Sequence, residues 1–167
     1  MKTLHLLRHA KSAWDEHGLS DRERGLNKRG QRDAPRMGQV LATLVTPQPI
    51  AVSPATRAQL TLAGICEGWP SLAAQSHVTV EALYTFDEEA VLDWLREQAD
   101  DRTSLFIIGH NPAFTDLVNV LAPAADLHNL PTAGYAQLEL AIDRWSGLAA
   151  GSGVLAHSLF PRELPDS

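Results

Sequence analysis

Two short aliphatic runs in the chain each end in a histidine. Residues 4–9 read LHLLRH, and residues 105–110 read LFIIGH. Runs this rich in aliphatic side chains are typical of strands that are buried on both faces of a parallel sheet. A third run, residues 50–52, stops at Ser53-Pro54 and is followed by a helical pattern. Strands that alternate with helices predict an α/β domain whose central sheet is mostly parallel and flanked by helices.

Apolar residues at helical spacing predict three further helices. They lie within residues 34–45, 91–95 and 114–121, and Pro112 precedes the last of them. Pro35 is expected to kink or shorten the first of these helices, because proline lacks the N–H group that the helix interior uses.

Two late strands are expected over residues 135–142 and 154–160, with a turn-rich link between them. The chain contains no internal repeat and no linker that would divide it. Its 167 residues fit one domain with a substantial core. We therefore expect a single three-layer domain over residues 1–160 and a frayed C-terminal tail over residues 161–167.

The polar residues that follow the three strand-like runs are the candidates for chemistry. Parallel strands bring their carboxyl ends to one crevice, where ligands of open α/β sheets bind. Arg8-His9 and His110 are expected to meet there, and Arg57 lies in the first turn of the helix after the third run. Because the N–H groups at a helix N-terminus attract anions, Ser53 and Arg57 predict an anion site built partly from main chain.

Four ordered motifs resemble those of a known family. They are Leu7-Arg8-His9, Leu26 to Gly30 (LNKRG), Ser53 to Ala58 (SPATRA) and Gly109-His110-Asn111. The family is the histidine phosphatase superfamily, whose Arg-His-Gly opening appears here as Arg8-His9-Ala10. The likeness is closest to its small SixA-like branch, and it extends through residues 81–84 and 130–133. The resemblance implies a phosphoglycerate mutase-like fold without a large cap, and phosphohistidine phosphatase activity.

Phosphoryl transfer explains why these residue types would be grouped. The reaction needs a nucleophile in line with the leaving atom and cations around the equatorial oxygens. Arg8 and Arg57 suit the second task, because a guanidinium offers bidentate donors and keeps its charge. The resemblance, rather than the spacing, makes His9 the nucleophile, with a phosphohistidine intermediate that water then attacks. His110 is left to donate a hydrogen bond to a phosphoryl oxygen.

The two histidines need different protonation states. An imidazole with a free pKa of about 6.5 is substantially neutral at neutral pH, and adjacent cations are expected to keep His9 neutral. A bound phosphate dianion favours the protonated form of His110, whereas an empty site with two arginines disfavours it.

Glu81 is the candidate general acid and later base. It ends a short strand-like run, and the wider superfamily carries an acidic residue at a comparable place. If Glu81 lies away from the phosphate, phosphohistidine becomes the better substrate, because imidazole departs as a weaker base than an alkoxide. Asp87, Glu88 and Glu89 compete for the role, but their place at the start of a predicted helix is typical of residues that complement its dipole.

Ser12, Asn111 and Thr132 are candidates for secondary phosphate contacts. Asn111 and Thr132 each follow an element that is expected to reach the crevice. Asn111 and Asn27 also fit helix N-caps, and this interpretation is preferred for Asn27. Gly30 is assigned to packing. Ala10 stands where the family motif has glycine, which predicts a different or strained backbone there if that position requires a positive φ.

The charge balance argues against nucleic acid as a partner. The net charge of −6 makes the surface as a whole repel phosphate backbones. Basic residues crowd only into residues 22–36. Most of them are expected to form a solvated helix face, whereas Arg22 and Arg24 precede that helix and either border the crevice or contact an acidic partner.

Composition places the chain among globular proteins. Its hydrophobic content is 44%, and its apolar runs are far shorter than the roughly 20 residues that span a bilayer. The single cysteine excludes an internal disulfide framework, and no signal peptide precedes the first strand, so a cytoplasmic location is expected. His5 and His9 lack a third ligand at metal-binding spacing, so neither a metal nor a cofactor is expected.

Three functions stay open at this point. The segment between Arg57 and His110 is too short for a helical lid, and an open site suits a phosphohistidine that protrudes from another protein. The same site would admit small phosphomonoesters. A noncatalytic phosphate- or phosphoprotein-binding module with this pocket is the third reading, and the oligomeric state is left open.

Overall fold

The computed structural model describes residues 1–14 and 18–165 of the chain. Within these residues the strands form one six-stranded sheet in the order β3-β2-β4-β1-β5-β6. The strands are β1 (Lys2–Arg8), β2 (Ile50–Val52), β3 (Val78–Thr79), β4 (Ser104–Gly109), β5 (Tyr135–Leu140) and β6 (Gly153–Leu159). Strands β3, β2, β4 and β1 run parallel to one another, whereas β5 and β6 join as antiparallel strands. The expected, mostly parallel sheet is confirmed.

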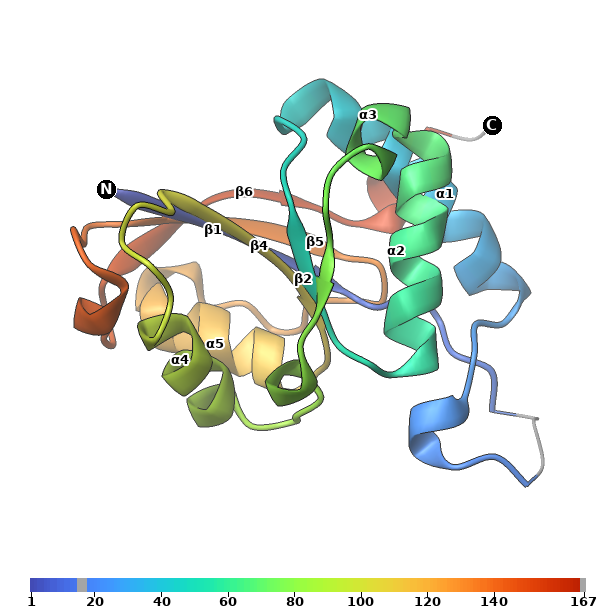
Figure 1. Cartoon of the computed structure of the whole chain (residues 1–167), viewed down its shortest axis with the longest axis horizontal. Coiled ribbons are helices and arrows are strands. Elements are labelled where there is room, and N and C mark those ends of the chain that lie inside the picture. The colour runs from blue at the N-terminus through green and yellow to red at the C-terminus, as the bar shows by residue number, and fades with distance from the viewer. Residues whose placement is uncertain (15–17, 166–167) are drawn as a thin grey trace.

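Helices cover both faces of this sheet, which makes the domain three-layered (Figure 1). The α-helices are α1 (Lys28–Leu44), α2 (Thr56–Gly68), α3 (Pro70–Ala73), α4 (Glu88–Arg96) and α5 (Ala113–Leu121). Short 3₁₀ turns lie at η1 (Asp21–Glu23), η2 (Glu81–Leu83), η3 (Pro123–Ala125), η4 (Trp145–Gly147) and η5 (Pro161–Glu163). Helices α1 and α2 pack on one face and α4 and α5 on the other. The connection from Arg57 to His110 holds no bulky cap, and all of its residues are described.

The two aliphatic runs are buried from both sides, as their composition predicts. In β1, Leu4 and Leu6 join the core under α4 and α5, while Leu7 joins the core under α1 and α2. In β4, Ile107 and Ile108 divide between the same two cores. Successive side chains of a strand point to opposite faces, so a strand covered on both faces needs apolar residues at every position.

Helices α1 and α2 approach closely through glycine. A Cβ atom added to Gly38 of α1 would collide with the main-chain oxygen of Ile65, and one added to Gly64 of α2 would lie 2.6 Å from the Cβ of Ala34. Helix α1 passes through Pro35 as one element, so the predicted shortening is not observed. Asn27 caps α1 by accepting from the Gly30 N–H (2.9 Å), as expected.

The segment expected to fray is largely packed. Residues 161–163 form η5, and both Pro161 and Leu164 are buried. The main-chain oxygen of Pro165 accepts from Arg36 (2.9 Å), which ties this segment to α1. Residues 166–167 of the expected tail lie outside the described residues. None of the described helices combines the length and apolar character that crossing a membrane demands.

Candidate active site

The carboxyl ends of β1, β2 and β4 meet at one edge of the sheet. Arg8 ends β1 opposite Gly109, the last residue of β4. Main-chain hydrogen bonds continue this register, from the His9 N–H to the Gly109 oxygen (3.1 Å) and from the Ser53 N–H to the Ile108 oxygen (3.1 Å). The residues that follow the three strands are therefore brought together, as the pattern predicts.

A cavity of about 250 Å³ opens at this edge. It is lined by Arg8, His9, Lys11, Ser12, Trp14, Asp21, Arg24, Arg57, Phe86, Asn111 and Thr132. A larger cavity of about 530 Å³ lies at the opposite, amino-terminal edge and is bordered by His5 and Ser104. There both ring nitrogens of His5 already have partners, Tyr135 (2.6 Å) and Ser104 (3.1 Å). Chemistry rather than size thus marks the smaller cavity as the candidate active site.

His9 is held with one nitrogen available to the cavity. Its Nδ1 lies 2.7 Å from the main-chain oxygen of Ala10, which can only accept, so Nδ1 carries the proton. Neutral imidazole then keeps a lone pair on Nε2. Burial lowers the pKa of His9 to about 3, and the charges of Arg57 and Arg8 act in the same direction. The neutral form expected from the neighbouring arginines is thus favoured, with burial as the largest cause.

His110 presents the complementary arrangement. Its Nε2 lies 2.7 Å from Ser53 Oγ, which also accepts from the Ala55 N–H (3.2 Å). Among the described residues, Nε2 is the one acceptor in contact with the buried Ser53 hydroxyl, so we assign the hydroxyl proton to this bond and the imidazole proton to Nδ1. That buried Nδ1 has no partner among the described residues. Burial and the charge of Arg57 lower the pKa of His110 to about 4.

The rings of His9 and His110 lie close together, with centroids 5.2 Å apart. Arg8 donates to the Leu130 oxygen (3.0 Å), and its buried Nε has no partner among the described residues. Burial and the charge of Arg57 lower the pKa of Arg8. A buried polar group without a partner is uncommon in native proteins, so Arg8 Nε and His110 Nδ1 are donors that an oxyanion would satisfy.

Arg57 enters the site from the first turn of α2, as predicted. Its side chain is 3% exposed, and it donates to the main-chain oxygen (2.7 Å) and to Oδ2 (3.1 Å) of Asp21. Thr61 connects the helix to the opening motif, because its hydroxyl donates to the Arg57 oxygen (2.7 Å) and accepts from the Ala10 N–H (2.8 Å). Arg57 is thus held in place by contacts of both its main chain and its side chain.

The three secondary candidates line the cavity. Ser12 is buried, and its main chain forms an isolated antiparallel β-bridge with Leu26. Asn111 accepts from the Thr115 N–H (3.1 Å) and hydroxyl (3.0 Å), and its amide donates to Leu130 and Asn129. Asn111 thus satisfies an N–H group in the first turn of α5, but it does so from the residue before the N-cap, which is Pro112. These bonds use most of the hydrogen-bonding capacity of its side chain.

Glu81 stands apart from the cavity-lining residues. Its carboxylate is paired with Arg22 through two hydrogen bonds of 2.5 and 2.9 Å, and the side chain is 70% exposed. The hydrogen bond from Arg22 lowers the pKa of Glu81, which favours the anion over the protonated form that a general acid needs. Asp87 caps α4 through the Glu89 N–H (3.1 Å), as its position before that helix predicts.

Sequence reasoning missed four of the residues that line the cavity, namely Lys11, Trp14, Asp21 and Phe86. Arg24, which was expected to border the crevice or to contact an acidic partner, lines the cavity, whereas Arg22 is paired with Glu81. Trp14 is 72% exposed, and the guanidinium of Arg24 lies over its ring at 3.6 Å. Most of these residues lie in connections without hydrophobic periodicity, so the sequence pattern does not predict which way their side chains point. The signal at hand was the run of alternating charges from residue 21 to residue 24.

Comparison with known proteins decides the family. The sequence profile of the histidine phosphatase superfamily (branch 1) matches residues 4–103. The chain belongs to this superfamily. An uncharacterized protein of Mycobacterium tuberculosis is 32% identical over 166 residues, which cover 93% of this chain and all of the relative.

Solved histidine phosphatases share the whole fold. A SixA protein of Agrobacterium tumefaciens, assigned as a phosphohistidine phosphatase, matches with a TM-score of 0.79 and 26% identity over 96% of this chain and 98% of its own. The protein histidine phosphatase SixA in complex with tungstate matches with a TM-score of 0.76 and 25% identity over 96% and 97%. The chain is therefore SixA-like, and its family supports phosphatase activity.

The alanine in the opening motif of this chain causes no backbone strain. Among the described residues other than glycine, positive φ angles occur at Asp126 and Ala133, not at Ala10. The Ala10 side chain is fully buried in the core under α1 and α2. The position thus tolerates a methyl group, and the strained alternative considered from sequence is wrong.

Proposed function

We propose that the chain hydrolyses phosphohistidine on a protein through a covalent phosphohistidine intermediate on His9. One observation carries the proposal: a neutral His9, with its lone pair on Nε2, shares a cavity with Arg8 and Arg57 beside the unpartnered Nδ1–H of His110. A nucleophile and donors to phosphoryl oxygens are the two requirements of this reaction.

The proposed reaction has two steps. In the first, His9 Nε2 forms a bond to phosphorus, and the bond from phosphorus to the leaving nitrogen breaks with its electron pair staying on that nitrogen. A substrate ring that carries a proton on its other nitrogen then departs as neutral imidazole. In the second, a water oxygen forms a bond to phosphorus, and the P–N bond breaks with its electron pair returning to Nε2. Both protons of the water leave with the inorganic phosphate, and His9, which has kept its Nδ1 proton, is restored as neutral imidazole. Arg8, Arg57 and His110 stabilise the charge on the equatorial oxygens in both steps.

The nature of the leaving group follows from the acids at hand. Among the described residues that line the cavity, Asp21 is the one carboxylate, and it is bonded to Arg24 (2.6 Å) and Arg57 (3.1 Å). Glu81 is held as an anion by Arg22, and we propose that it anchors that arginine rather than protonating a leaving group. A site without a ready proton donor favours imidazole, which departs as a weaker base than an alkoxide.

The surroundings of the cavity favour a protein as the carrier of the phosphate. Trp14 and Phe86 both line it, and they are 72% and 49% exposed. Exposed large aromatic side chains around a site are typical of surfaces that contact other proteins. No bulky cap covers the opening within the described connection from Arg57 to His110.

Parallel assays test the substrate class. The expected order of kcat/KM is a protein phosphorylated on histidine first, phosphorylated imidazole next and alkyl phosphomonoesters last. The difference in kcat/KM between the phosphorylated protein and phosphorylated imidazole reports contacts with the carrier protein. The difference between phosphorylated imidazole and the alkyl phosphomonoesters reports the need for a proton donor. A clear preference for alkyl phosphomonoesters would overturn the substrate proposal, and binding without turnover of all three would identify a noncatalytic module.

A further inference from the structure

Asp21 makes more contacts around the cavity than any role so far accounts for. Its main-chain oxygen and Oδ2 accept from the two terminal nitrogens of Arg57, at 2.7 and 3.1 Å. Oδ1 accepts from Arg24 (2.6 Å), and Oδ2 also accepts from the Tyr84 hydroxyl (2.5 Å). One carboxylate thus joins three segments that are distant in sequence: the connection before α1, the start of α2 and the residues before α4.

These contacts fix the orientation of Arg57. An arginine that is held through two nitrogens by one residue cannot rotate about its terminal bonds, and its remaining N–H groups point elsewhere. Arg57 also lines the cavity. Because the cation is buried to 3% exposure, a fixed orientation before substrate binds removes reorganisation from the reaction itself.

The same carboxylate reaches His110 through Tyr84. The rings of Tyr84 and His110 meet edge to face, with centroids 5.5 Å apart, while the Tyr84 hydroxyl donates to Asp21. The ring of Phe86 meets His110 in a similar way at 5.6 Å. Asp21 thus contacts Arg57 directly and is connected to His110 through the side chain of Tyr84.

Asp21 stays charged in this arrangement. Partial burial opposes ionisation, but hydrogen bonds from Tyr84 and Arg57 and the charges of Arg57 and Arg24 lower the pKa of its carboxyl group. A permanent carboxylate in contact with a phosphate-binding arginine can act in two opposite ways: it can orient the arginine, or it can compete with the phosphate for it. The geometry decides between them, since Asp21 occupies only part of the hydrogen-bonding capacity of Arg57.

We propose that Asp21 is a positioning residue of the phosphate site, which holds Arg57 in the orientation that stabilises the transferring phosphoryl group. The proposal deepens the proposed function, because it concerns the same site. It predicts that loss of the carboxylate harms the transition state more than the binding of the ground state.

The test compares two variants that remove equal charges from one short turn. Asp21→Asn removes the carboxylate that contacts Arg57. Glu23→Gln is the matched control, because Glu23 is exposed and bonds to Ser20 (2.8 Å) rather than to the cavity. Tyr84→Phe is a milder second probe, which removes one donor to Asp21 and keeps the ring against His110.

Two measurements are made on the whole chain. The binding of orthovanadate, followed by calorimetry, requires no turnover and reports the geometry that resembles the transition state. For Asp21→Asn we expect it to weaken by about tenfold or more, the scale of one charge-assisted hydrogen bond, with kcat falling in parallel and KM changing by less than about threefold. For Tyr84→Phe we expect a smaller loss of about fivefold, because one donor to Asp21 is lost while the carboxylate that contacts Arg57 is kept. Glu23→Gln is expected to match the wild type.

Each outcome bears on the proposal. Tighter vanadate binding or a lower KM in Asp21→Asn would mean that Asp21 competes with phosphate, and the proposal would be overturned. Equal losses in Asp21→Asn and Glu23→Gln, or no loss in either, would overturn it as well. If Asp21→Asn does not fold, Tyr84→Phe gives the same reading. If the wild type binds vanadate but hydrolyses no substrate, the proposed function is wrong. The role of Asp21 is then decided by vanadate binding alone.

Discussion

The imidazole rings of His9 and His110 lie 5.2 Å apart, and hydrogen bonds leave a different nitrogen of each ring free. A main-chain carbonyl holds the proton of His9 on Nδ1, and a serine hydroxyl directs the proton of His110 to Nδ1 as well. In His9 the free atom is the acceptor Nε2, and in His110 it is the donor Nδ1. Two identical side chains thereby acquire opposite tasks from their hydrogen-bond partners.

Replacing Arg8 or Arg57 removes a positive charge from the proposed phosphate site. For Arg57→Ala and for Arg8→Ala we expect kcat to fall by at least about a hundredfold, by analogy with the loss of one preorganised donor from a transition-state site. Steady-state kinetics with one phosphoryl substrate measures this.

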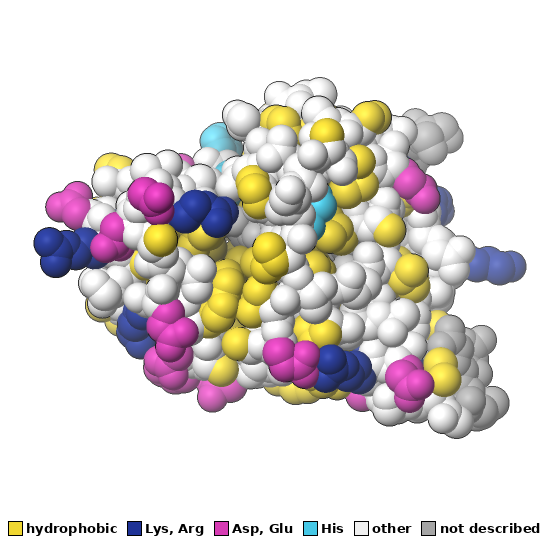
Figure 2. Space-filling view, viewed as in Figure 1, with side chains coloured by type: hydrophobic (Ala, Val, Ile, Leu, Met, Phe, Trp, Pro, Cys, Tyr) yellow, Lys and Arg dark blue, Asp and Glu magenta, His cyan; other side chains and the backbone are white. Residues whose placement is uncertain are grey.

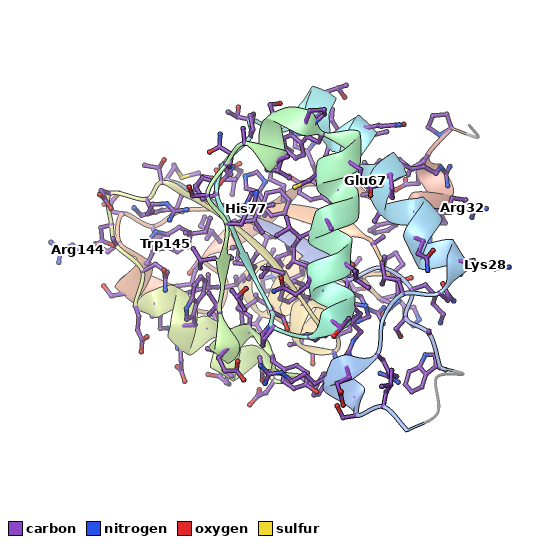
Figure 3. All side chains as sticks on the ribbon, turned by 45° about the vertical axis from the view of Figure 1, so that its right-hand side comes forward. Lys28, Arg32, Glu67, His77, Arg144 and Trp145 are labelled. Atoms are coloured by element: carbon purple, nitrogen blue, oxygen red, sulfur yellow. The ribbon has the colours of Figure 1, made fainter. Side chains whose placement is uncertain are left out.

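Arg32→Ala is the matched control for both variants. Arg32 lies on the outer face of α1 and points away from the body of the protein (Figure 3), and its side chain is 65% exposed. We expect near-wild-type turnover from this variant. Near-wild-type turnover from Arg57→Ala would exclude Arg57 from the chemistry.

Ser53 sets the tautomer of His110. Ser53→Ala removes the hydroxyl whose proton faces Nε2, so the Nδ1–H form loses its support. We expect kcat to fall by about fivefold, the scale of one neutral hydrogen bond. Nitrogen NMR of the ring is expected to show the proton shared between Nδ1 and Nε2 in the variant. An unchanged Nδ1–H tautomer together with unchanged kcat would show that Ser53 has no such role.

Buried histidines make stability depend on pH. Burial lowers the pKa of His5 to about 4, that of His9 to about 3 and that of His110 to about 4. In the unfolded chain these values return to about 6.5. Above about pH 6.5 both states are neutral; as the pH falls below it, the unfolded chain binds protons that the folded chain does not, so stability is lost.

Urea denaturation between about pH 7 and pH 5 measures this loss. The free energy of unfolding is expected to fall by about 1.4 kcal/mol per pH unit for each buried histidine well below pH 6.5. His5→Gln, which lies outside the active site, is expected to remove about a third of the slope. A free energy of unfolding that does not change over this range contradicts the assignment.

Gly38 permits the close contact between α1 and α2. In Gly38→Ala the new methyl group meets the main-chain oxygen of Ile65, and main chain cannot move aside cheaply. We expect a loss of about 1–3 kcal/mol in the free energy of unfolding, as in other overpacked cores. Gly147→Ala is the control, since nothing lies within 4 Å of the added atom. Equal stabilities of the two variants would show that the helices separate without cost.

The sheet and the four central residues were accessible from sequence for a physical reason. Strands β1 and β4 are buried on both faces, so their aliphatic runs are continuous and their ends are sharp. Arg8, His9 and His110 follow those ends directly, and Arg57 follows a helix start that Ser53-Pro54 marks. The carboxyl-edge rule of parallel sheets then places all four together.

The rest of the site depends on tertiary contacts that leave no periodic trace. Asp21 reaches Arg57 across 36 positions, and Arg22 reaches Glu81 across 59. The end of a strand-like run and the family resemblance made Glu81 the candidate acid, and no sequence pattern shows that this carboxylate pairs with Arg22. On one face of the protein, acidic and basic side chains lie next to each other along its lower edge (Figure 2). The fold decides which of these charges meet, because exposed charged residues follow no periodic pattern in the sequence.

Localising the transferred phosphate tests the central claim most directly. The enzyme is mixed rapidly with a labelled histidine-phosphorylated protein, quenched in alkali, digested and mapped by mass spectrometry, with NMR of the labelled peptide to identify the nitrogen. The account predicts acid-labile phosphate on Nε2 of His9 in the wild type and none in His9→Ala. Equal labelling of the two proteins, phosphate on another side chain, or wild-type turnover without any labelled intermediate would contradict it.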